Sequence, residues 1–186
     1  MEKKIYLKVL KLFENKGTHF TTEDLAKELG TSKRSIYTYF KSKEDMIEKT
    51  INFVFSDMSQ MDYDLMENKE LSLIDKIKSS IITIPDAYNI GAIIQHADDL
   101  ERYYPELWKK ANEYLDTIWD TLISLVNRGI KEGELEEIDT NILKLILRES
   151  LKKLLDYRYM VSNNCSFESG IKAINQIILY GIIKRD

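Results

Sequence analysis

Residues that interrupt helices are scarce in this chain, and this scarcity constrains its fold more than any other feature. Only 7 glycines and 2 prolines occur among 186 residues. Glycine and proline disfavour helix interiors most strongly, so long stretches are free to be helical. Apolar side chains recur at helical spacing nearly throughout, and no run shows the two-residue period of a strand. We therefore predict an all-α fold of about nine helices.

Charge is distributed unevenly between the two parts of the sequence. The whole chain has a formal net charge of −4. Residues 1–50 carry 11 basic and 8 acidic side chains, whereas residues 51–186 carry 16 basic and 23 acidic ones. A mildly basic head on an acidic body indicates that only the head meets nucleic-acid phosphate.

Other features favour a cytoplasmic protein without a membrane partner. The single cysteine, Cys165, cannot form an intrachain disulfide, which suits a reducing compartment. The N-terminus has no uninterrupted apolar stretch of the signal-peptide kind. No apolar run approaches the ~18 residues that a membrane span needs.

Three helices are predicted in the first forty residues. The first carries one apolar stripe and is closed by Gly17. A capping box at Thr21 opens a short second helix, which Gly30 can end in the left-handed conformation. Ser32 then caps a short third helix that runs to Phe40. Two short helices joined by a tight glycine turn, behind a supporting helix, are typical of a helix-turn-helix.

The remaining sequence predicts a helical body. A capping box at Ser42 opens a longer helix that links a DNA-binding domain, residues 1–48, to a body, residues 49–186. The apolar pattern thins over residues 60–68, which indicates a loop there. Further helices are expected at residues 69–83, 85–100, 105–133, 140–161 and 167–183.

Residues 30–47 resemble the recognition region of the tetracycline-repressor (TetR) family. They read GTSKRSIYTYFKSKEDMI, and the preceding TTEDLAKELG resembles the second helix of that family. Residues 128–135, RGIKEGEL, resemble a segment that ends a long helix in the same family. The N-terminal resemblance covers residues 5–55 and implies a DNA-binding transcriptional regulator.

The resemblance also implies which side chains contact duplex DNA. They are Thr21, Ser32, Lys33, Arg34, Ser35, Tyr37, Thr38, Tyr39 and Lys43. The third helix would face the major groove, and its two tyrosines would reach the DNA backbone. Thr21 and Lys43 would contact phosphates at helix N-termini, which attract anions. Many relatives carry glycine where this chain has Arg34, and its guanidinium could grip a guanine or a phosphate.

The last two helices carry more apolar surface than one chain needs. The resemblance implies that they form a homodimer as a four-helix bundle, which would present two recognition helices to two half-sites. The expected interface residues are Leu151, Leu155, Ile174 and Ile178.

The size of the body suggests a pocket for an unknown small-molecule effector. Polar groups on otherwise apolar helix faces can anchor a ligand. We expect the pocket to be lined by Tyr88, His96, Trp108 and Arg148. A hydrogen-bonded core histidine is the alternative role of His96, and the aromatic residues fit a core equally well.

No motif indicates an enzyme or a metalloprotein. The two histidines, His19 and His96, are far apart, and no cysteine–histidine spacing suits a metal. We therefore expect no catalytic residues, no metal and no cofactor. The expected function is a ligand-responsive repressor that binds a palindromic operator as a homodimer. The alternatives are an all-α enzyme, or a helix-turn-helix scaffold that does not read DNA.

Overall fold

The computed structural model describes residues 2–88 and 95–182, which are helical along most of their length. Within these ranges no β-strand forms, and no helix is long and apolar enough to cross a membrane. The helices are α1 (Glu2–Lys16), α2 (Thr22–Leu29), α3 (Lys33–Tyr39), α4 (Lys43–Glu67), α5 (Leu73–Tyr88), α7 (Ala97–Tyr103), α8 (Pro105–Thr117), α9 (Asp120–Glu132), α10 (Thr140–Leu154), α11 (Tyr157–Ser162) and α12 (Phe167–Ile182). The predicted all-α fold is thereby confirmed.

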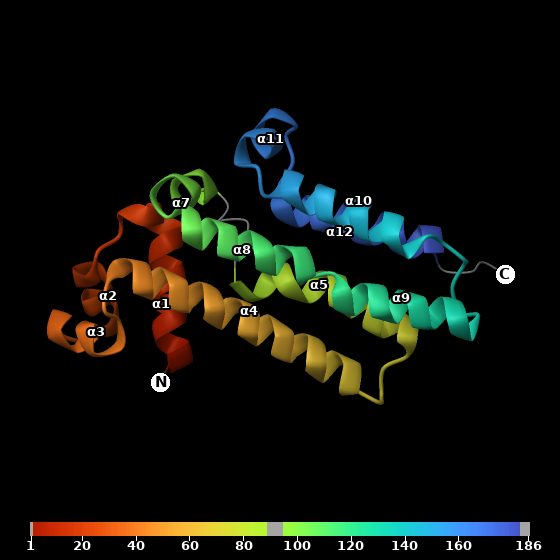
Figure 1. The fold of residues 1–186 in the computed structure, drawn as a ribbon, viewed down its shortest axis with the longest axis horizontal. Coiled ribbons are helices and arrows are strands. Elements are labelled where there is room, and N and C mark those ends of the chain that lie inside the picture. Colours follow the sequence, from red (N-terminus) through yellow and green to blue (C-terminus); the bar gives the residue numbers. More distant parts are fainter. Residues whose placement is uncertain (1, 89–94, 183–186) are drawn as a thin grey trace.

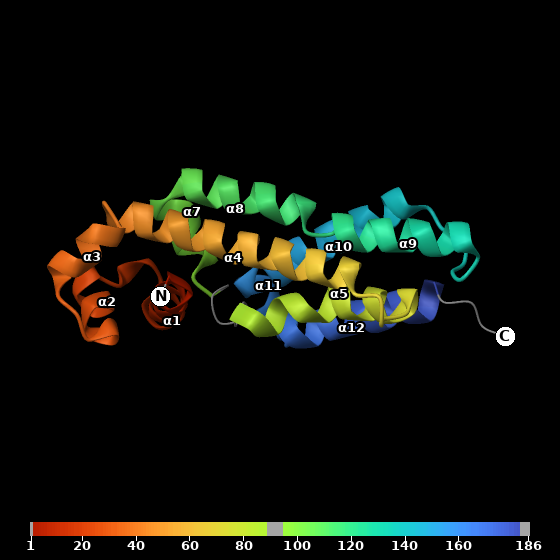
Figure 2. The same cartoon turned by 90° about the horizontal axis from the view of Figure 1, so that it is seen from below.

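The molecule is elongated, with α2 and α3 at one end (Figure 1). Helix α4 runs from this head along the body, beside α5 and α8. Turned by 90°, the same view places α3 at the tip, far from α9 (Figure 2). The head therefore projects its short helices away from the rest of the chain.

The apolar core of the head includes side chains from the body. Buried side chains from the first four helices, including Phe20, Leu25 and Ile36, form one apolar cluster. Leu100 of α7 and Leu107 of α8 belong to the same cluster, with 8% and 5% of their surface exposed. Burial of these leucines ties the head to the body by the hydrophobic effect.

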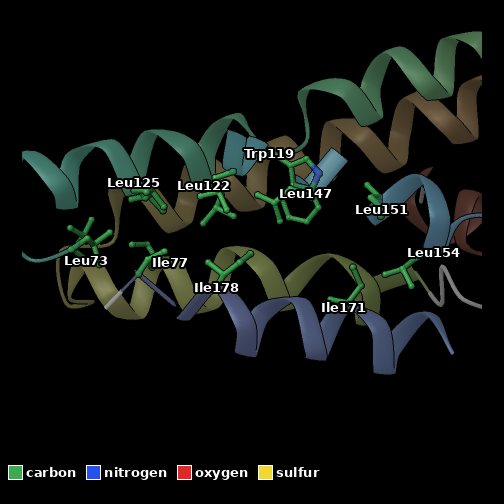
Figure 3. Packing of buried hydrophobic residues seen from close by; sticks show 14 of the residues in the cluster. Leu73, Ile77, Trp119, Leu122, Leu125, Leu147, Leu151, Leu154, Ile171 and Ile178 are labelled. Atoms are coloured by element: carbon green, nitrogen blue, oxygen red, sulfur yellow. The ribbon is translucent and has the colours of Figure 1, made fainter. Parts of the chain in front are cut away.

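A second core lies between α5, α9, α10 and α12 (Figure 3). Leu125, Leu147 and Ile77 are fully buried at its centre. A Cβ atom at Gly170 of α12 would overlap the side chain of Leu154 of α10. The missing side chain therefore permits these two helices to pack closely.

The loop predicted over residues 60–68 is wrong, because α4 continues to Glu67. Met58 is buried just before this stretch, and within it the Gln60 amide donates to the Asp64 carboxylate at 2.8 Å, one turn away. Packing against α5 supplies the stability that propensity alone does not. The acidic residues that thinned the apolar pattern lie on a helix, not in a loop.

The helix predicted over residues 85–100 is also wrong. Pro85 lies inside α5, which ends at Tyr88, and α7 begins only at Ala97. Residues 89–94, which that prediction also covered, lie outside the described residues. A proline inside a helix costs about 3 kcal/mol. We attribute its tolerance here to the packing of α5 against α9 and α12.

Two of the predicted long helices are each divided into two. The helix expected over residues 105–133 is α8 followed by α9, with Trp119 at the break and buried in the core. The helix expected over residues 140–161 is α10 followed by α11, where Asp156 caps the new start by accepting from the Tyr159 N–H. Buried side chains continue on both sides of each break, so periodicity alone does not reveal it.

Candidate nucleic-acid interface

Helix α2 begins at the capping box that the sequence predicts. The Thr21 hydroxyl accepts from the Asp24 N–H at 3.2 Å, and the Asp24 carboxylate accepts from the Thr21 N–H at 2.8 Å. Lys16 at the end of α1 donates to the same carboxylate at 2.6 Å. This hydrogen bond, followed by those from Thr21, lowers the pKa of Asp24 to about 2. The end of α1 is therefore joined to the start of α2.

A tight turn orients α3 relative to α2. Gly30 adopts φ 63° and ψ 36°, the left-handed conformation that the sequence predicts, and its N–H donates to carbonyls of the last turn of α2. The Thr31 N–H donates to the Ala26 carbonyl at 2.9 Å. Ser32 then caps α3 by accepting from the Ser35 N–H at 3.1 Å. These bonds satisfy backbone groups at both helix ends and hold the turn rigid.

Helix α3 is only 7 residues long and has one buried face. Ile36 and the following Phe40 are 1% and 2% exposed, and they fasten the helix to the head core. Tyr37 and Tyr39 expose 49% and 42% of their surface, unusually much for aromatic rings. The exposed residues among those expected to contact DNA are Thr21, Ser32, Lys33, Arg34, Tyr37, Thr38 and Tyr39. Ser35 is half-buried, and its carbonyl accepts from the Thr38 hydroxyl at 2.6 Å.

The two cations of α3 differ in their surroundings. Lys33 forms an ion pair with Glu23 of α2, and this hydrogen bond lowers the pKa of Glu23. Glu23 is not among the residues expected at the interface, because its partner lies ten residues later in another helix. Arg34 is exposed and, among the described residues, forms no ion pair. Its guanidinium is therefore available to an external anion.

Lys43, expected to contact a phosphate, is engaged within the head. Its ammonium donates to the Thr18 carbonyl and lies 5.0 Å from the centre of the Phe20 ring. Burial lowers the pKa of Lys43, although the Asp24 charge opposes this effect. A phosphate contact by the Lys43 ammonium requires that the bond to Thr18 be given up.

The arrangement of α1 to α4 matches that of known regulators. A family model for bacterial regulatory proteins of the tetR family matches residues 9–50, from within α1 to within α4. The likeness to the tetR family is thus shown for the helix-turn-helix region, residues 9–50. The chain is 25% identical to the uncharacterized HTH-type transcriptional regulator YvaF of Bacillus subtilis, over 98% of this chain and 95% of that protein.

Solved structures share the fold of this chain along nearly its whole length. One is a protein of Saccharomonospora viridis in complex with choline, with a TM-score of 0.74, 19% identity, and 98% and 97% of the two chains covered. Another is the regulator FadR of Bacillus subtilis in complex with stearoyl-CoA, with a TM-score of 0.67, 20% identity, and 97% and 99% covered. The likeness therefore extends beyond the head to the helical body.

The four residues expected to line an effector pocket do not lie together. Trp108 lines an apolar cavity between α1, α4, α7 and α8. His96 is half-buried, and its Nε2 lies 3.1 Å from the Glu14 carbonyl of α1. Arg148 lies at the surface beside Glu149.

Tyr88, the fourth, is buried elsewhere. Its hydroxyl donates to Asp57 of α4, and the same carboxylate binds Lys3 of α1 at 2.9 Å. Burial raises the pKa of the Tyr88 phenol. Tyr88 thus joins α5 to α1 and α4 and does not line the cavity around Trp108.

The residues expected at a dimer interface pack inside the protein's own core. Leu151 and Ile178 are buried, while Leu155 and Ile174 are half-buried against the same cluster. The exposed apolar side chains of these helices are instead Ile142, Leu145 and Ile146 of α10 and Ile177 and Tyr180 of α12. They are about half to three-quarters exposed, with Ile177 at 72%. We call these five residues the apolar face. It lies on the two helices expected to form the dimer, but it contains none of the four residues expected at the interface.

Among the described residues, no three histidine, cysteine, aspartate or glutamate side chains gather as a metal site. The single cysteine, Cys165, is free and half-buried.

Proposed function

We propose that this protein is a ligand-responsive transcriptional repressor that binds a palindromic operator as a homodimer. The observation that carries the proposal is α3, a short helix braced by Ile36 and exposed on its opposite face at the tip of the molecule. Its donors and aromatic rings suit base edges and phosphates in a major groove. We propose a regulatory role and not a catalytic one, because the B. subtilis relatives named above are described as regulators.

The apolar face supports the homodimer. Exposed Ile, Leu and Tyr side chains on two neighbouring helices form the kind of patch that marks an interface. A second copy related by a two-fold axis would cover this patch with the same patch. The two heads would then lie on the same assembly and could read two half-sites.

The cavity around Trp108 supports a small-molecule effector. Its walls come from α1 of the head, from α4, which links the head to the body, and from α7 and α8 of the body. Relatives of this fold were solved with choline and with stearoyl-CoA, so the fold accommodates chemically different ligands. An effector in this chain would act through its different affinity for the DNA-bound and free shapes of the dimer.

The proposal is tested by DNA binding of the full-length protein to the duplex upstream of its own gene. We expect Arg34→Ala to weaken binding and to flatten the plot of log K against log salt by about 0.9 for one lost phosphate contact. Arg128→Ala is the matched control, because it removes the same charge from α9 at the other end of the molecule. If the wild-type protein binds no duplex, the alternative of a helix-turn-helix scaffold replaces this proposal.

A further inference from the structure

The cavity around Trp108 is almost wholly apolar. Its volume is about 160 Å³, and aromatic and branched side chains such as Phe13, Ile51 and Phe55 line it. Thr50 is the one hydroxyl among its described lining residues, and it donates to the Met46 carbonyl of its own helix at 2.7 Å. The cavity therefore offers a ligand dispersion contacts and no free hydroxyl proton. An apolar cavity of roughly 150 Å³ has room for a small hydrocarbon such as benzene.

A wider polar hollow at the surface adjoins the cavity. Ala97, Trp108 and Leu155 line both spaces, so the two lie side by side. The hollow has a volume of about 950 Å³ and lies between α7, α8 and the end of α10. A ligand that passes between these three side chains would bury an apolar part in the cavity while its polar end stays in water.

Negative charge predominates in the hollow. Among the described residues, the lining carries five carboxylates and three cations. The carboxylates belong to Asp98, Asp99, Glu101, Asp116 and Asp156, and the cations to Arg102, Lys152 and Arg158. Arg158 pairs with Asp98 at 3.1 Å, and Lys152 lies 3.4 Å from Glu149 outside the hollow. Arg148, also outside the hollow, lies 3.8 Å from Asp116. Asp99 and Glu101 form no ion pair among the described residues. A cationic head group is attracted here, and an anionic one is repelled.

We propose that this composite site binds a small organic cation with a hydrocarbon tail, such as an alkylamine. The tail occupies the cavity and the ammonium lies in the hollow near Asp99 and Glu101. This assignment rests on the proposed function, for which it names the class of effector. Because α1 and α4 form walls of the cavity, a bound tail would act on two helices whose buried side chains share the head core with Ile36 of α3.

The experiment compares three probes with the same tail: n-octylammonium, n-octanol and n-octanoate. Binding is measured by the shift in Tm and by tryptophan fluorescence of Trp119→Phe, in which Trp108 is the remaining tryptophan. We expect octylammonium to bind about tenfold more tightly than octanoate, with octanol between them. Equal or tighter binding of octanoate, or no saturable binding of octylammonium, would overturn the proposal.

Two variants distinguish the contribution of the hydrocarbon tail to binding from that of the charged group. Ala111→Leu adds side-chain volume to the cavity wall, and we expect it to reduce octylammonium binding at least about tenfold. Lys109→Leu, on the exposed side of the same helix, is its control. The double change Asp99→Asn with Glu101→Gln should bring octylammonium and octanoate to within about threefold of each other. Glu106→Gln, outside the hollow, should leave the preference intact.

Failure of this inference is distinguishable from failure of the proposed function. A protein that binds its upstream duplex but none of the probes retains its function as a regulator and loses this ligand site. A protein that binds octylammonium at the cavity but no duplex retains the site and loses the proposed function. If Ala111→Leu does not fold, the charge variants and the titration of Trp108 fluorescence with the three probes still show whether the site prefers a cationic or an anionic head group.

Discussion

A Cβ atom at Gly17 would lie 2.7 Å from Nδ1 of His96. The imidazole is held there by its Nε2, 3.1 Å from the Glu14 carbonyl, and by an edge-on contact with Phe13. Gly17 itself has φ +54°, a left-handed conformation that glycine adopts without strain. The end of α1 and the residue before α7 therefore meet where only glycine fits, and His96 serves the junction between head and body.

Gly17→Ala should destabilise the protein more than the backbone conformation alone explains. Gly133→Ala is the matched control, because Gly133 has φ +76° and a methyl group added there would meet no atom within 4 Å. We expect the control to lose about 1–2 kcal/mol of unfolding free energy through strain. Gly17→Ala should lose about 1–3 kcal/mol more, because His96 must move. Urea denaturation measures both losses, and equal losses would contradict the close contact.

The lowered pKa of Asp24 predicts that the protein loses stability in acid. Its pKa in the folded protein is about 2, against an ordinary value of 3.8, chiefly because Lys16 binds the carboxylate. The folded state thus holds this proton less tightly than the unfolded state, and the resulting stability is present above pH 3.8 and lost as the pH falls to about 2. Asp24→Asn should flatten the dependence of unfolding free energy on pH in this window.

Lys16→Met provides the second arm of that measurement. It removes the largest cause of the lowered pKa of Asp24 while leaving the capping box in place. We expect it to flatten the same pH window partly, and to have little further effect in the Asp24→Asn background. Additive effects of the two changes would show that Lys16 does not act through Asp24.

The apolar face predicts the oligomeric state. Ile177→Glu should yield a folded monomer, because this side chain is 72% exposed in the single chain and would place an unpaired carboxylate in a dimer interface. Val161→Glu, at a 62% exposed position on α11 outside the apolar face, should leave the dimer intact. Sedimentation at micromolar concentration measures both. A dimeric Ile177→Glu protein would place the interface elsewhere.

Lys33 and Lys43 should have different effects on DNA binding and on stability. Lys33→Met removes an exposed cation. We therefore expect the slope of log K against log salt to become flatter by about 0.9, and the unfolding free energy to stay nearly unchanged. Lys43→Met removes the bond to the Thr18 carbonyl, so we expect a lower Tm, with about 1–3 kcal/mol of unfolding free energy lost. Identical salt slopes for the two variants would mean that Lys43 leaves Thr18 when DNA binds.

Local backbone chemistry is the part of this structure that the sequence predicts best. Thr21, Gly30 and Ser32 all take their expected capping roles, because each depends on residues within one turn. The choice between Ile177 and Ile178 shows the limit. Helix α12 is apolar on two faces, and periodicity shows which residues share a face but not which face meets the chain's own core.

The candidate ligand site depends on contacts that sequence spacing does not contain. Trp108 lines a cavity that is also lined by Phe13, far away in the chain. The helical spacing of Tyr88 predicts a pocket residue, but its hydroxyl donates a hydrogen bond to Asp57, 31 residues earlier. Such pairings are decided by how helices pack, which is a property of the assembled core.

The shared cluster around Leu100 and Leu107 has a consequence for engineering. A fragment cut after residue 48 would lose both leucines and would expose the part of the cluster that they now cover. We therefore expect that residues 1–48 do not fold as an independent DNA-binding domain that can be transferred to another protein. A chimera that borrows residues 1–48 from a relative would need that relative's side chains at positions 100 and 107 as well.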